Sequence, residues 1–132
     1  AGYYHPGETA MIVGVIIRKD VYIIRPKGTY EHKMSAEIEA KIFELIERGA
    51  SKFILDLKRV KGILSRGVHS LIEIYDRVKE VGGTIKLCGL HRDVKFFLQF
   101  AQLNEVFEIF AEQNEALLSY GVYLRKRETP KP

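Results

Sequence analysis

Strand-sized runs of apolar and β-branched residues alternate along the chain with stretches whose apolar residues recur at helical spacing. The predicted strands lie at residues 11–17, 21–25, 53–57, 84–88 and 106–110. The first two are separated only by Arg18, Lys19 and Asp20, which predicts a β-hairpin. The runs at 53–57 and 84–88 are almost wholly apolar, which is typical of strands buried on both faces of a sheet.

Helices are predicted in the stretches between and after these strands. The first begins at Ser35 and ends at Gly49, and its apolar face consists of Ile38, Ile42, Leu45 and Ile46. The second follows Ser65, and its apolar stripe consists of Val68, Leu71, Ile72, Tyr75 and Val78. Asp93 is expected to cap a third helix, whose stripe consists of Val94, Phe97, Leu98 and Ala101. A closing helix is predicted at residues 112–119.

The order of these elements predicts an α/β domain with a mixed, mostly parallel sheet and about four α-helices. The single domain is expected at residues 11–121, since one hydrophobic core usually takes about 100–150 residues. Residues 1–10 lack periodicity and are interpreted as an N-terminal extension, either native or left by cloning. Residues 122–132 are interpreted as a basic, flexible tail.

The composition indicates a soluble protein of a reducing compartment, and we expect a cytoplasmic location. No apolar run approaches the roughly 18–20 residues that cross a bilayer, so no membrane span is expected. A single cysteine cannot form a disulfide within the chain. The net charge of +4 is a mild excess, with its one dense cluster at residues 125–127, and no stacking-aromatic signature accompanies it. We therefore do not expect nucleic-acid binding.

Catalysis finds little support among the reactive residues, and no cofactor or metal is expected. The four histidines are scattered, and no phosphate-binding loop or nucleophile elbow is present. Cys88 and His91 could form a nucleophilic pair, but a small filler in a core strand is the favoured interpretation of Cys88. Asp56, at the end of a predicted buried strand, is interpreted as organising the following loop.

Ser65 stands immediately before the second helix and has two interpretations. As an N-cap, its hydroxyl would stabilise the helix by about 1 kcal/mol relative to alanine. As a phosphoacceptor, it would place a phosphate at the positive end of the helix dipole and add a charge of about −1.5 to −2 to the surrounding surface. Gly67 would allow another backbone to come close. The residues alone favour the cap.

Residues 53–83 resemble the signature region of the STAS domain, the family of bacterial anti-sigma factor antagonists. That family has a strand ending D-L-S-x-V, then F-[IM]-D-S-[ST]-G-L, an amphipathic helix and a G-G turn. Here residues 56–60 read DLKRV, residues 62–68 read GILSRGV, and glycines stand at 82 and 83. Residues 28–31, GTYE, are similar to the family's G-E-L-D, and LQFAQLNEVFEIF and NEALLSYG are similar to later family segments.

The resemblance implies a regulatory protein that binds an anti-sigma factor and thereby frees a sigma factor. The anti-sigma factor of this family is a serine kinase, whose phosphorylation of the matching serine prevents binding until a phosphatase restores it. Carried over, Ser65 is the phosphoacceptor, and the expected partner-binding residues are Glu31, Leu64, Arg66, Gly67, Val68 and His69. The motif departs from the family at Leu64, where aspartate is usual, and at Arg66, which would place a cation beside a phosphate.

Two other functions remain open. The chain could be an unphosphorylated scaffold or transport-accessory module, including one that forms a homodimer. It could also be a STAS-like module that binds a small molecule or lipid in a pocket lined by Phe96, Phe97 and Phe100. Phenylalanines at that spacing are more often part of the core.

Overall fold

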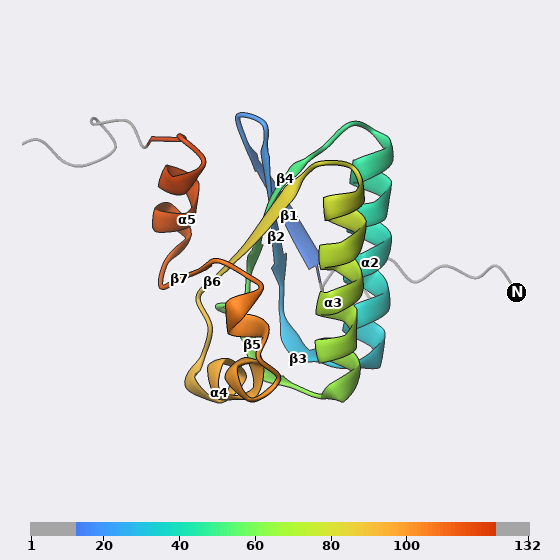
Figure 1. Cartoon of the computed structure of the whole chain (residues 1–132), viewed down its shortest axis with the longest axis vertical. Helices are drawn as coiled ribbons and strands as arrows, with labels where there is room; N and C mark the ends of the chain where they lie inside the picture. The colour runs from blue at the N-terminus through green and yellow to red at the C-terminus, as the bar shows by residue number, and fades with distance from the viewer. Residues whose placement is uncertain (1–12, 124–132) are drawn as a thin grey trace, which may run out of the picture.

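The computed structural model describes residues 13–123 and forms one α/β layered unit (Figure 1). The strands are β1 (Val13–Arg18), β2 (Val21–Pro26), β3 (Gly28–Tyr30), β4 (Lys52–Asp56), β5 (Val60–Ile63), β6 (Thr84–Cys88) and β7 (Ile109–Phe110). The helices are α2 (His32–Glu47), α3 (Ser65–Glu80), α4 (Arg92–Phe100) and α5 (Gln113–Ser119), with a 3-10 turn at Leu103–Glu105. Within the described residues, the four α-helices and the mixed sheet confirm the predicted fold class.

The main sheet has five strands in the order β1-β2-β4-β6-β7. The pair β1 and β2 is antiparallel, as the predicted hairpin requires, and Lys19 turns the chain with a positive φ of 57°. From β2 onward every neighbouring pair is parallel. A second sheet consists of only two parallel strands, β3 and β5, which the pattern of apolar residues did not reveal.

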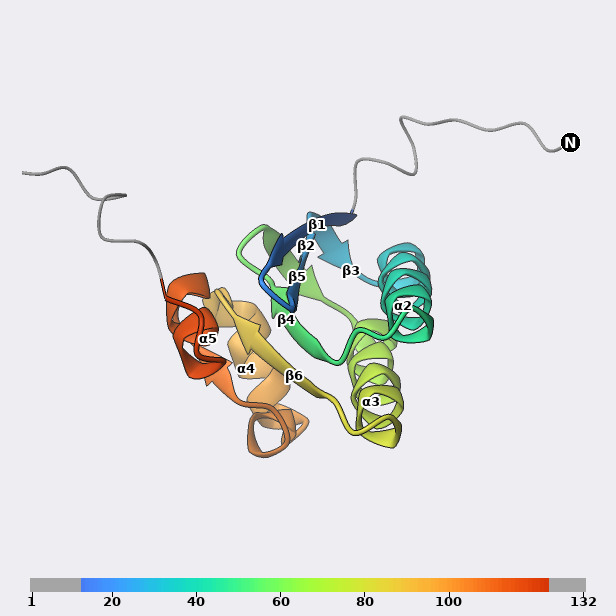
Figure 2. The ribbon, with the colours of Figure 1, turned by 90° about the horizontal axis from the view of Figure 1, so that it is seen from above.

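Helices cover both faces of the main sheet (Figures 1 and 2). Helices α2 and α3 lie side by side on one face, and α5 lies on the other. Strand β4 confirms the expectation of burial on both faces, because Phe53 and Leu55 belong to the larger core cluster while Ile54 belongs to the α5 side. Helix α4 lies at the end of the molecule where α3 begins, and it packs against β5.

Several predicted boundaries were wrong. Helix α2 begins at His32, one turn before Ser35, because the Ser35 backbone N–H already donates to the carbonyl of the N-cap Glu31 at 2.8 Å. Ser35 is fully buried, and its hydroxyl donates to the carbonyl of Arg66 at 3.4 Å. The N-cap of α4 is His91, so Asp93 lies in the first turn rather than at the cap. The predicted strand at residues 106–110 is reduced to Ile109–Phe110, because a 3-10 turn and a bend occupy the residues before it.

Two predicted core residues are exposed. Ile72, placed on the buried stripe of α3, is 42% exposed, because Leu71 and Ile74 face the core instead. Ala101 is the exposed C-cap of α4.

The proposed ends of the domain fall mostly outside the described residues. The N-terminal extension at residues 1–10, the first two residues of the predicted strand 11–17, and residues 124–132 all lie there. The predicted tail begins too early, however. Val122 is only 8% exposed, packs in the α5 cluster and donates its backbone N–H to Leu117 at 3.0 Å.

Candidate docking site at the start of α3

Strands β3 and β5 bring the two halves of the candidate site together. They run parallel, with Tyr30 paired with Ile63, so the residues that follow each strand emerge at the same edge. The backbone N–H of Leu64 donates to the carbonyl of Tyr30 at 3.0 Å, which extends the pairing by one residue. Glu31 therefore lies next to Leu64, although 33 positions separate them in the sequence.

The first turn of α3 is packed directly on Tyr30. A Cβ added at Gly67 would lie 2.5 Å from the Tyr30 carbonyl oxygen and 2.9 Å from both the Tyr30 ring and the Ile63 side chain. One turn later, the hydroxyls of Ser70 and Tyr30 share a hydrogen bond of 3.0 Å in the interior. Burial raises the pKa of Tyr30 well above its usual value, so this hydroxyl stays neutral. Tyr30, Gly67 and Ser70 thus fix the start of the helix.

Ser65 is the first residue of α3 and is exposed. The prediction that Ser65 caps the helix was wrong. The N-cap is Leu64, whose φ of −111° and ψ of 174° are extended, and no side chain caps this end. Leu64 is itself 54% exposed.

Arg66 links the site to α2. Its guanidinium nitrogen lies 3.8 Å from the Glu39 carboxylate, whose side chain is only 14% exposed. Within the described residues, the buried Glu39 Oε2 accepts no hydrogen bond. The long ion pair with Arg66 is therefore the interaction that offsets the cost of burying this carboxylate oxygen. The Arg66 side chain is 42% exposed.

The remaining predicted site residues differ in accessibility. His69 is exposed, whereas Glu31 and Val68 are half-buried. Gly67 is buried against Tyr30, so it positions the helix and is not part of the exposed surface. The stabilising roles of Tyr30 and Ser70 were missed, because a tyrosine in a three-residue strand and a serine inside a helix carry no pattern of their own.

The residues considered for catalysis have structural roles. Cys88 is 1% exposed, and burial, together with the nearby Asp56 carboxylate, raises its pKa to about 12. His91 does not activate it, since its Nε2 lies 2.6 Å from the carbonyl oxygen of Lys58. The Asp56 carboxylate accepts hydrogen bonds from the Lys58 backbone at 3.0 Å and the Gln113 side chain at 2.8 Å. The predicted core role of Cys88 and loop-organising role of Asp56 are confirmed.

Residues 13–123 contain no group of three or more histidines, cysteines or acidic residues that could hold a metal ion. No helix in this part of the chain is long and apolar enough to cross a membrane. Phe96 and Phe100 do not line a pocket with Phe97. They are 68% and 79% exposed, while Phe97 packs partly against the core.

Comparison of the sequence with known proteins identifies a family and a named relative. The family model described as the STAS domain matches residues 14–116. The chain is 25% identical over 105 residues to the anti-sigma F factor antagonist of Paenibacillus polymyxa, covering 79% of this chain and 90% of that one.

Two solved structures extend the comparison of folds. The Bacillus cell fate determinant SpoIIAA in its phosphorylated form superposes with a TM-score of 0.67 at 23% identity, covering 82% of this chain and 98% of that one. A sulfate transporter family protein from Wolinella succinogenes superposes with a TM-score of 0.72 at 21% identity, covering 80% and 88%. The family model spans the sheet, the Ser65 threshold and the first turn of α5, and the chain belongs to the STAS domain family.

Proposed function

We propose that this chain is an anti-sigma factor antagonist that docks on an anti-sigma factor through the surface around Glu31 and residues 64–69. The relative named anti-sigma F factor antagonist, aligned over 79% of this chain, supports the class of function. The observation that carries the proposal is the exposure of Ser65 and Leu64 at the uncapped threshold of α3, beside Glu31. The chain works by docking and not by catalysis, and its partner is an anti-sigma factor with serine kinase activity.

Phosphorylation of Ser65 is the switch in this proposal. Helix α3 has 16 residues, no acidic residue in its first turn and no side-chain cap, so its N-terminal dipole is free to stabilise a phosphate. Arg66 follows directly, and its exposed guanidinium, 3.8 Å from the Glu39 carboxylate, would be shared between Glu39 and the phosphate. The modification would leave the fold intact while changing the charge of the docking surface by about −1.5 to −2. A serine phosphatase would reverse it.

The test compares three proteins against the anti-sigma factors of the host: wild type, Ser65→Ala and Ser65→Glu. Wild type and Ser65→Ala should bind one of them with similar dissociation constants, and Ser65→Glu should bind at least about tenfold more weakly, because one charge at a buried contact is worth about 2 kcal/mol or more. Incubation with that partner and ATP should phosphorylate wild type and leave Ser65→Ala unmodified. Equal binding by all three proteins would contradict the switch.

A second candidate function is a scaffold or transport-accessory module that does not use phosphorylation. The structural likeness to a sulfate transporter family protein is the observation that favours it. Leu64 and Arg66 would then be plain interface residues, with self-association as one outcome. Analytical ultracentrifugation distinguishes the two: a dimer that persists on dilution, together with no phosphorylation at Ser65, would favour the scaffold.

A further inference from the structure

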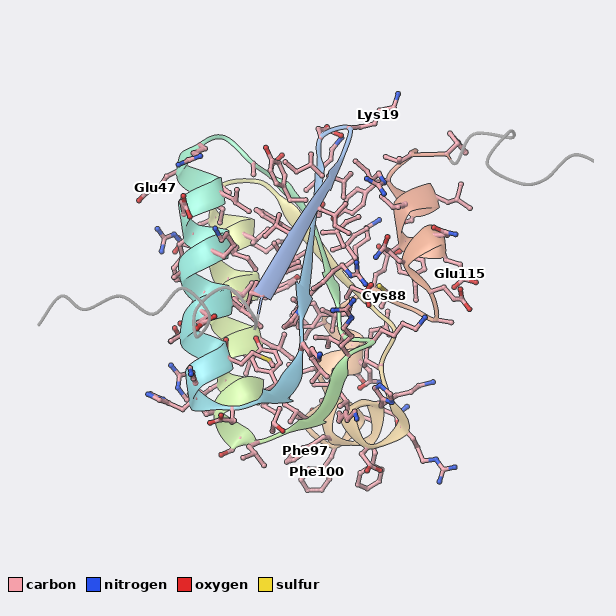
Figure 3. The ribbon with its side chains drawn as sticks, turned by 180° about the vertical axis from the view of Figure 1, so that it is seen from behind. Lys19, Glu47, Cys88, Phe97, Phe100 and Glu115 are labelled. Carbon is pink, nitrogen blue, oxygen red and sulfur yellow. The ribbon has the colours of Figure 1, made fainter. Side chains whose placement is uncertain are left out.

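Two phenylalanines of α4 are unusually exposed. Phe96 and Phe100 are 68% and 79% exposed, whereas Val94 and Leu98 of the same helix are fully buried. With Arg92 they occupy positions i, i+4 and i+8, so the three side chains form one ridge along the outer face of α4. Figure 3 shows Phe100 projecting from the end of the molecule at which α3 begins. Core packing therefore does not account for this ridge.

The ridge lies beside the candidate docking site. Helix α4 packs against β5, and the Lys58 carbonyl before β5 lies 2.6 Å from Nε2 of His91 before α4. Strand β5 leads directly into Leu64 and Ser65. Leu64, at 54% exposure, thus follows the strand on which α4 packs, and Leu64, Phe96 and Phe100 are the exposed apolar group of these two adjoining segments.

Basic residues are frequent in the two segments that carry this apolar group. Residues 58–66 contain Lys58, Arg59, Lys61 and Arg66, all exposed, and no acidic residue. Helix α4 adds two basic residues and one acidic residue, Arg92, Lys95 and Asp93. The two segments together have a formal charge of +5, whereas residues 13–123 as a whole, with 17 basic and 15 acidic residues, have +2. The excess positive charge of the described domain is therefore concentrated in these two segments, although the acidic Glu31 lies beside Leu64.

We infer that the face formed by Leu64, Phe96 and Phe100 within this basic surround binds a protein surface whose apolar centre is rimmed by aspartate and glutamate. The inference rests on the proposed function, which assigns docking to the end of the molecule where α3 begins. It adds α4 to the docking surface and specifies the chemistry of the partner. Aromatic side chains that insert into a partner pocket supply much of the binding energy of an interface, and complementary charge speeds and orients the encounter. A phosphate on Ser65 would lower the positive charge of the same face, which fits the proposed switch.

The first test uses the anti-sigma factor that binds the wild-type chain. Phe100→Ser should weaken binding about tenfold or more, the loss typical of a buried aromatic anchor, while Leu118→Ser should not. Leu118 is a matched control because it is an exposed apolar residue, 49% exposed, on α5. Lys61→Glu should also weaken binding and flatten its salt dependence, whereas Lys19→Glu, at the opposite end in Figure 3, should have no effect. If Ser65→Glu weakens binding and Phe100→Ser does not, this inference fails and the proposed function stands.

The second test does not depend on any anti-sigma factor. The photo-crosslinker p-benzoylphenylalanine is placed at position 100, or at position 118 as a control, and the host cells are irradiated. A crosslink from position 100 alone to an acidic protein segment, abolished by Lys61→Glu, supports the inference even where no anti-sigma factor binds and the proposed function fails. A crosslink only to a second copy of the chain, or none above the position 118 control, overturns it. Sedimentation of wild type, but not Phe100→Ser, with phosphatidylcholine vesicles containing phosphatidylglycerol would assign the face to anionic membranes and also overturn it.

Discussion

Gly67→Ala should destabilise the domain, although alanine is the better helix residue. In an exposed helix interior this change would stabilise by about 1 kcal/mol. Here the new Cβ would lie 2.5 Å from the Tyr30 carbonyl oxygen, which is backbone, and 2.9 Å from the Ile63 side chain. Tyr30 and Ile63 are almost completely buried, so neither can move aside without disturbing the core. Overpacking of this kind costs typically about 1–3 kcal/mol, which exceeds the gain in helix propensity.

Urea unfolding followed by circular dichroism measures this difference. From the middle of that range, an overpacking cost of about 2 kcal/mol less the gain of about 1 kcal/mol in helix propensity leaves a net loss of about 1 kcal/mol. With an m-value of about 2 kcal/mol per molar, the midpoint should fall by about 0.5 M. Gly62→Ala is the matched control, because no atom lies within 4 Å of a Cβ added there, and its midpoint should not fall. The same Gly67 variant should also bind the partner less tightly, since the first turn of α3 carries Ser65. Equal midpoints for the two alanine variants would refute the argument from the Tyr30 contact.

Three further predictions concern buried polar groups. Tyr30→Phe and Ser70→Ala should each lower the free energy of unfolding, measured in urea, by about 1–3 kcal/mol, because each leaves one hydroxyl unpaired. The double variant should lose less than the sum of the two losses. Strict additivity would show that the 3.0 Å hydrogen bond contributes nothing to stability. Because burial raises the pKa of Cys88 from 9.0 to about 12, the folded state holds its proton longer than the unfolded state, so stability should fall as pH rises from about 9 toward 12. Comparing wild type with Cys88→Ala isolates this thiol, and rapid native labelling of Cys88 by a thiol reagent at pH 8 would contradict its burial. Asp56→Ala should lower the free energy of unfolding in urea by about 1–3 kcal/mol, because it removes the acceptor of the Lys58 backbone N–H. The isosteric Asp56→Asn keeps an oxygen acceptor there and should lower it less.

The main sheet and its helices were predictable because their signals are long and periodic. The hairpin of β1 and β2 follows from two β-branched runs with a short polar gap, and β4 is recognisable because both of its faces are apolar. The helix boundaries were less predictable. Serine is a good N-cap in general, yet Ser35 lies inside α2, where its hydroxyl donates to the carbonyl of Arg66, 31 positions away. A local pattern contains no information about such a distant partner.

The exposed ridge of α4 could not be recognised for a related reason. A helical stripe predicts which residues share a face, but it does not say how many of them the neighbouring strands cover. Val94 and Leu98 meet the core, whereas Phe96 and Phe100 lie on the opposite side. Phenylalanine is normally assigned to the interior, so its exposure becomes visible only when the packing is known.

The candidate site shows which features of a site can be predicted from local sequence and which depend on the tertiary fold. The assignment of Ser65 as phosphoacceptor comes from a family-like motif and stays a proposal, and the structure adds that Ser65 is exposed. The pairing that brings the start of α3 next to Glu31 is that of β3 with β5. These strands have three and four residues, and neither contains a run of apolar residues. Strands this short gain little from intrinsic preference and exist because Tyr30, Val60 and Ile63 are buried in the larger core cluster. A change that expels Tyr30 from the core should therefore separate the two halves of the docking site before it unfolds the five-stranded sheet, and hydrogen exchange at the Leu64 amide, bonded to the Tyr30 carbonyl, would report that separation directly.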